Sequence, residues 1–145
     1  MLCVASCEKM VVSDDAGASL SAVTRTEAGA YNRLNFVVFD TDGERVDQIN
    51  QEAGDDDFGQ AQFTLPVGTY RLAIVAHSAK GNPSVNKATY NEDGTRKKNE
   101  SISFSNDKGY TDTFFGSQQV EVGEEISIRE PRLVSISPST TVRVW

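Results

Sequence analysis

Residues that could hold a metal ion or act as a reactive nucleophile are scarce in this sequence. Its 145 residues include two cysteines and one histidine. Both cysteines, Cys3 and Cys7, lie close to the N-terminus, so no disulfide bond can crosslink the body of the fold. Because zinc sites and activated nucleophiles draw on these residue types, the sequence predicts a protein without a metal or cofactor and favours a non-enzymatic function.

The sequence also lacks a basic surplus and a long apolar run. Lys and Arg number 14 and Asp and Glu number 21, which gives a formal net charge of −7. This charge argues against nucleic acid as a partner, because a phosphate backbone requires a basic surface. The sequence contains no apolar run of about 18 residues that could cross a bilayer as a helix. The length favours one domain with one buried core.

Apolar residues do not recur at helical spacing in any window, and several segments alternate as strands do. Arg33–Phe39 is rich in β-branched and aromatic residues. Phe36 and Val38 would share one face of this strand, and Val37 and Phe39 would share the other. Because both faces are apolar, the segment is predicted to be a central strand.

Further short strands are expected, separated by turn signals about every 8–12 residues. They are Glu44–Ile49, Gln60–Leu65, Tyr70–Ala76, Ile102–Phe104, Phe114–Phe115, Gln118–Val122, Glu125–Arg129, Leu133–Ile136 and Thr141–Val144. The polar stretch between Ser78 and Glu100 is expected to be a surface excursion. The pattern predicts an all-β protein, built as a two-sheet antiparallel β-sandwich.

The N-terminus resembles a bacterial lipobox. Val4–Cys7 comprises an aliphatic residue, two small residues and a cysteine, so signal cleavage would leave Cys7 as the lipidated first residue. Only six residues precede Cys7, too few for an export signal. Either the signal begins upstream of Met1 or the resemblance is accidental, with Cys3 and Cys7 as incidental thiols. Residues 8–19 are small and polar, as suits a tether.

Three polar motifs allow a chemical role, and each has a structural alternative. Asp40–Glu44 resembles part of a calcium loop, but its glycine is the fourth residue rather than the sixth, and a hairpin turn explains the same residues. His77 ends a strand without a Gly-x-Ser-x-Gly motif, so a surface histidine is expected. Arg96–Lys98 is a short basic patch, which either contacts a partner or belongs to a solvated loop.

Four stretches in order resemble the N-terminal domain of fimbrillin-like lipoproteins, the shaft, tip and anchor subunits of type V pili. Leu34–Val46 is an apolar strand followed by Phe-Asp-x-x-Gly, and Phe63–Ala76 contains Leu-Pro-x-Gly-x-Tyr before an apolar strand. Thr111–Gly116 is similar to an Asp-Thr-Phe segment of that family. Ile126–Arg129 resembles the strand with which the family's first domain ends.

This resemblance implies a transthyretin-like β-sandwich, export as a lipoprotein to the outer membrane, and assembly with other pilus subunits by strand donation. In polymerising members of the family, a protease cuts after a basic residue behind the first strand. Leu20–Gly29 matches that strand and loop, so Arg25 is the implied cut site. An exposed arginine in a linker is the alternative.

The expected organisation has four parts. Residues 1–7 would be the remainder of a lipoprotein signal, and residues 8–29 a tether that includes a candidate first strand. Residues 30–130 would form the fimbrillin-like N-terminal sandwich. Residues 131–145 would be a terminal strand, or the stub of a truncated second domain.

Two functions fit this organisation. The favoured one is a structural or adhesive pilus subunit at the cell surface. The alternative is a surface lipoprotein that binds a glycan or another extracellular ligand, whose signature would be an exposed cluster of aromatic rings. Tyr31, Tyr90, Tyr110 and Trp145 are scattered along the chain, so the sequence favours the pilus subunit.

Overall fold

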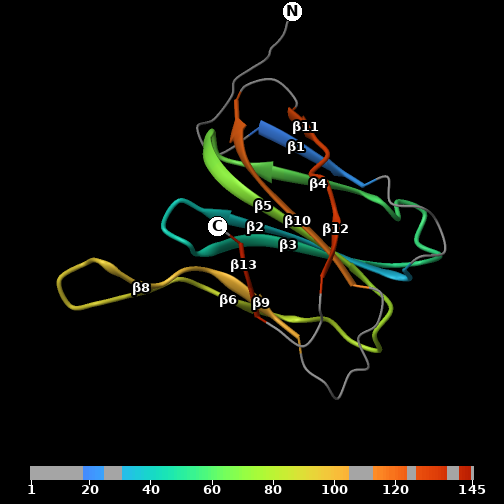
Figure 1. Cartoon of the computed structure of the whole chain (residues 1–145). Helices are drawn as coiled ribbons and strands as arrows, with labels where there is room; N and C mark the ends of the chain where they lie inside the picture. The colour runs from blue at the N-terminus through green and yellow to red at the C-terminus, as the bar shows by residue number, and fades with distance from the viewer. Residues whose placement is uncertain (1–17, 25–30, 105–112, 124–126, 137–140, 145) are drawn as a thin grey trace, which may run out of the picture.

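The computed structural model describes residues 18–24, 31–104, 113–123, 127–136 and 141–144. In these ranges the chain forms strands and turns and contains no helix, which confirms the expected all-β class. It follows that no described segment has the length and apolar character of a membrane-spanning helix. The strands are arranged in stacked layers (Figure 1).

A five-stranded sheet forms the middle layer (Figure 1). Its strands are β2 (Arg33–Asp40), β3 (Arg45–Glu52), β5 (Gly68–His77), β10 (Thr113–Val122) and β12 (Val134–Ile136). Their order is β12-β10-β5-β2-β3, and every neighbouring pair is antiparallel. The sequence predicted two short strands where β10 is a single one.

Strand β2 is buried on both faces, as its sequence predicted. Phe36 and Val38 belong to one hydrophobic cluster, and Val37 and Phe39 belong to a second cluster on the other side of the sheet. Its partner β5 alternates in the same way, with both faces buried along most of its length. A sheet whose two middle strands are apolar on both faces requires a covering layer on each side.

A three-stranded sheet covers the first face. Its order is β11-β1-β4, with β1 (Ala18–Val23), β4 (Gln60–Leu65) and β11 (Ser127–Arg129). Strand β1 runs antiparallel to β4 and parallel to β11. Side chains from this sheet and the central sheet form the larger core, so the expected β-sandwich is confirmed.

A third layer, which the sequence did not predict, covers the opposite face. It is a sheet of β6 (Ser84–Asn86), β9 (Ser101–Ser103) and β13 (Thr141–Arg143), in the order β13-β9-β6. One residue of each strand faces the second cluster: Val85, Ile102 and Val142. The sequence predicted strands at Ile102–Phe104 and Thr141–Val144, but not that they would pair with each other and with β6.

The stretch between Ser78 and Glu100 is more structured than expected. Besides β6, it forms the hairpin of β7 (Thr89–Tyr90) and β8 (Arg96–Lys98). Ala79 and Ala88 are buried within it. Most of the stretch is exposed, as expected of a surface excursion, whereas Ala79 and Ala88 pack against the body because their side chains are small.

The end of the described chain packs onto the same layers. A side chain at Gly116 would collide with the carbonyl oxygen of Arg132, so this glycine allows the segment leading to β12 to cross β10 closely. Strand β12 then pairs with β10, and β13 pairs with β9. A domain division at residue 130 stays a prediction.

Candidate functional site

The two residues that the sequence singled out for processing, Cys7 and Arg25, lie outside the described residues. The strand between them is described. Strand β1 begins at Ala18, and its pairing ends at Val23, two residues before Arg25. The functional interpretation therefore depends on how β1 is held.

Strand β1 is the middle strand of its sheet, so neighbours bond to both of its edges. Along one edge it pairs with β4 over six residues, from Ala18 opposite Leu65 to Val23 opposite Gln60. Along the other edge, Leu20 to Ala22 pair with β11. If β1 left, two rows of backbone hydrogen-bonding groups would be exposed, and another strand could pair with them.

The inward face of β1 carries small and medium apolar side chains. Leu20 and Ala22 have no exposed surface, and they belong to the same core cluster as Phe36 and Leu72 of the central sheet. Leu20 lies opposite Phe63 of β4. Burial of a leucine contributes about 1.5–3 kcal/mol, so β1 adds to the core.

We call this place the β1 seat: the edges of β4 and β11 with the buried side chains beneath β1. The chain leaves it in an ordered way, because the N–H of Thr24 donates to the carbonyl of Gly59 over 2.9 Å. Arg25 follows directly. A cut after Arg25 would leave β1 bound to the body without a covalent link.

His77 is buried, with no exposed surface, so the expectation of a surface histidine is wrong. The N–H of Ala79 donates to its Nδ1 over 3.2 Å. The ring hydrogen therefore sits on Nε2, which donates to Oδ1 of Asn35 over 2.8 Å. The Asn35 amide in turn donates to Asn50 and Asn82. His77 is thus part of a buried hydrogen-bond network that ties β5 to β2.

The histidine is neutral at physiological pH. Burial, and to a smaller extent the positive charge of Arg33, together lower the pKa of His77 to about 4. The two ring nitrogens are used in the network, one as donor and one as acceptor. The position of His77 at a strand end gave no sign of this burial, because its partner Asn35 lies 42 residues earlier in the sequence.

The Asp40–Gly43 motif forms the hairpin turn between β2 and β3. Oδ1 of Asp40 accepts the backbone N–H groups of Asp42 and Glu44, at 2.9 and 3.0 Å. Gly43 has a φ of +82°, and a side chain there would collide with Ala88. The turn thus also docks the segment before β7.

A buried carboxylate holds the β7–β8 hairpin against the body. Glu100 has no exposed surface; Oε2 accepts from Arg71 at 3.0 Å and Oε1 from Arg96 at 2.8 Å. Burial alone would raise its pKa, but hydrogen bonds from its own backbone and from the two arginines outweigh burial and lower it. Arg96 also donates to the carbonyl of Thr41 at 2.6 Å.

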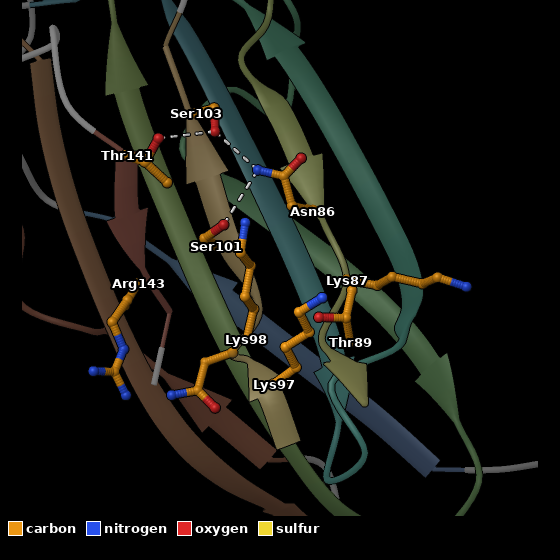
Figure 2. A pocket seen from close by; sticks show the side chains of 10 residues that line it. Asn86, Lys87, Thr89, Lys97, Lys98, Ser101, Ser103, Thr141 and Arg143 are labelled. Atoms are coloured by element: carbon orange, nitrogen blue, oxygen red, sulfur yellow. Dashed lines mark hydrogen bonds between the residues drawn. The ribbon is translucent and has the colours of Figure 1, made fainter. Parts of the chain in front are cut away.

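Arg96 is therefore structural, whereas the next two residues of the basic patch are not. Lys97 and Lys98 border a polar hollow of about 770 Å³ on the outer side of the third layer (Figure 2). Its other lining residues are Asn86, Lys87, Thr89, Asn99, Ser101, Ser103, Thr141 and Arg143. Sequence reasoning missed this site, since β13 comes next to β9 only through long-range pairing.

Tyr90, a half-exposed aromatic residue of the β7–β8 hairpin, already contacts other residues of the chain. Tyr90 is 42% exposed, but the Arg96 guanidinium lies 5.7 Å from its ring centroid. Its hydroxyl donates to the carbonyl of Asp42. Tyr31 is buried in the core, and Tyr110 and Trp145 lie outside the described residues.

The histidine network gives a direct prediction. Its folded pKa of about 4 lies below the unfolded value of 6.5, so unfolded chains bind more protons between these values, and stability falls as the pH drops. We expect the wild type to lose about 3 kcal/mol of unfolding free energy from pH 6.5 to pH 4, relative to His77→Gln. The measurement is denaturant unfolding at several pH values. Since His77 is the only histidine, an NMR imidazole titration near 6.5 would contradict the assignment.

Comparisons with known proteins agree with this fold. The model of the family described as fimbrillin-A associated anchor proteins Mfa1 and Mfa2 matches residues 11–136, and no curated protein matches the chain. A crystal structure from Bacteroides thetaiotaomicron, described as a candidate polysaccharide-binding protein, has a TM-score of 0.56 at 14% identity, over 81% of this chain and 47% of that one. A second crystal structure from that organism, described as a candidate adhesin, has a TM-score of 0.54 at 16% identity. The match covers 87% of this chain and 47% of that one.

These identities show a shared fold alone, and the chain spans about half the length of both structures. The family match is of a different kind, because it extends over most of the sequence and includes β1, β4 and the central sheet. It confirms the resemblance to fimbrillin-like proteins. The chain belongs to the family of fimbrillin-A associated anchor proteins Mfa1 and Mfa2.

Proposed function

We propose that this chain is a non-enzymatic subunit of a cell-surface pilus, and that subunits join by exchanging the strand in the β1 seat. The observation that carries the proposal is the position of β1. It is a middle strand with a full ladder to β4, yet it lies at the N-terminal end of the described chain. A strand there can be replaced without breaking the chain elsewhere.

The β1 seat can accept an incoming strand that has small or medium apolar side chains at alternate positions. It offers backbone groups on both edges and a floor that accepts side chains of the size of Leu20 and Ala22 at alternate positions. In β-strand addition, backbone hydrogen bonds supply affinity and the alternating pockets supply specificity. A neighbouring subunit would recover the same bonds that β1 makes.

The order of residues along the chain couples attachment to assembly. A lipid on Cys7 would reach the body through residues 8–17 and then β1, and ten extended residues span at most about 35 Å. A cut after Arg25 would separate the lipid from the body and free the seat in one step. In this proposal, uncut subunits stay anchored at the outer membrane and cut subunits polymerise.

Refilling of the seat is directly testable. We expect a chain that starts at Thr26 to melt below the full chain, and a peptide of residues 18–25 to raise its melting temperature by about 5–10 °C at 100-fold excess over Kd. The measurement is differential scanning fluorimetry against peptide concentration. If the shortened chain is unfolded alone, the peptide should restore its β-sheet circular dichroism.

Two variant peptides provide the control. Leu20→Asn places an amide in the buried floor and should abolish the effect, whereas Ser19→Asn changes the outward face and should keep most of it. Equal effects of the two peptides, or no effect of the parent peptide, would refute strand exchange at this seat.

The processing site gives a separate prediction. An arginine-specific protease should cut the folded full chain first after Arg25, and N-terminal sequencing should find a new terminus at Thr26. Arg25→Lys keeps the charge and should resist this cut. A first cut at an arginine within a strand of the body would argue against a processing loop at this position.

Lipid attachment is tested in cells. With an export signal for lipoproteins placed before Leu2, the chain should incorporate labelled palmitate, because Cys7 then stands at the end of a complete lipobox. Cys7→Ala should abolish the label, and Cys3→Ala should leave it unchanged. Equal labelling of the two variants would remove the lipid anchor from the proposal.

A further inference from the structure

The hollow bordered by Lys97 and Lys98, called the basic hollow from here on, lies on the opposite side of the central sheet from the β1 seat. Its floor belongs to the third layer, whose core residues form the second hydrophobic cluster, while β1 packs on the first. A strand in the seat therefore leaves the hollow open. The two features can serve different ligands on one subunit.

The pairing register determines which side chains form the floor. In β9, Ile102 faces the core, so Ser101 and Ser103 face outward. Asn86 lies opposite Ser101 on one side, and Arg143 lies opposite it on the other. Residues of three separate segments are thus aligned in one outward row.

Hydrogen bonds join this row to Ser103 and Thr141, which lie in a second row beside it. The amide of Asn86 donates to Ser101 at 3.2 Å and to Ser103 at 2.9 Å, and the hydroxyls of Ser103 and Thr141 lie 3.1 Å apart (Figure 2). The floor is therefore a connected set of hydroxyl and amide groups. Such groups both donate and accept, as is required to bind the hydroxyls of a sugar.

The positive charge of the hollow is not neutralised within the described chain. No described carboxylate forms a salt bridge with Lys97, Lys98 or Arg143. None of the described residues that line the hollow is acidic. Figure 2 shows Lys98 extending toward Ser101 and the amine of Lys87 pointing away. In a protein of net charge −7, this local excess of cations marks a place for an anion.

The types of side chain in the lining favour a saccharide over other polymeric anions. Among the described residues no aromatic ring lines the hollow, which disfavours single-stranded nucleic acid, whose bases stack on rings. The lining residues that the structure describes also include no apolar side chain, which disfavours a peptide anchored by apolar residues. A charged sugar polymer needs cations and a polar floor, and it needs no ring.

We propose that this hollow binds an anionic polysaccharide. Lys97, Lys98 and Arg143 contact its carboxylate or sulfate groups, and the hydrogen-bonded set of Asn86, Ser101, Ser103 and Thr141 contacts its hydroxyls. Charge-assisted hydrogen bonds from lysine and arginine are stronger than neutral ones. Binding weakens as salt rises, because the cations are exposed.

The test measures binding of four polymers to the full chain by microscale thermophoresis. Polygalacturonate carries carboxylates, dextran sulfate carries sulfates, dextran is neutral, and a DNA oligonucleotide carries phosphates. We expect polygalacturonate or dextran sulfate to bind and dextran not to bind. Equal binding of dextran, or tighter binding of DNA than of both anionic sugars, would overturn the proposal.

Two sets of variants locate the site. The double variant Lys97→Gln and Lys98→Gln should weaken binding about tenfold, and Arg143→Gln should weaken it less. Lys80→Gln removes the charge of an exposed lysine outside the hollow and should leave Kd unchanged. An equal loss in Lys80→Gln would mean that net charge, and not this hollow, governs binding.

Asn86→Asp tests the floor. It keeps the side-chain shape but places a negative charge next to Ser101 and Ser103, so binding should fall further than with either neutral substitution. The melting temperature of each variant shows whether it folds. A folded Asn86→Asp that binds like the wild type would exclude the row as the contact surface. Loss of strand exchange with retained binding, or the reverse, separates this proposal from the function of the seat.

Discussion

The two-sided burial of β2 and β5 is the constraint on which the rest of the structure depends. Both strands carry apolar side chains on both faces, so water must be excluded from both sides of the central sheet. One side is covered by the sheet of β1, β4 and β11, and the other by β6, β9 and β13. This requirement places the seat and the basic hollow on opposite sides of one body.

Polar groups inside these layers are satisfied by specific partners. His77 is held by the Ala79 N–H and the Asn35 carbonyl oxygen, and Glu100 by two arginines. Buried polar groups cost free energy unless they are hydrogen-bonded, so each network favours one packing of the chain over its alternatives. Glu100 does this for the β7–β8 hairpin, on which Lys97 and Lys98 are exposed.

The energetics of the seat differ from those of the central strands. Strand β1 has a buried leucine and alanine and a complete ladder, whereas β2 inserts large side chains into both cores. A strand of similar pattern from a neighbour would restore the same ladder and bury a similar area, so exchange involves little net change in the bonds at the seat. Loss of β2 would have no such replacement. This asymmetry makes β1, and not a central strand, the exchangeable element.

Local alternation in the sequence was enough to predict the strands at 33–39, 60–65 and 70–76 and their inward faces, because a strand's period of two residues is a property of neighbouring positions. The turn at Asp40–Gly43 was predicted from the residue types of the turn itself. The parallel pairing of β1 with β11, the union of β13 with β9, and the burial of His77 were decided by the tertiary structure alone. These features join segments far apart in the chain, and which segments meet depends on how the whole chain covers both faces of one sheet.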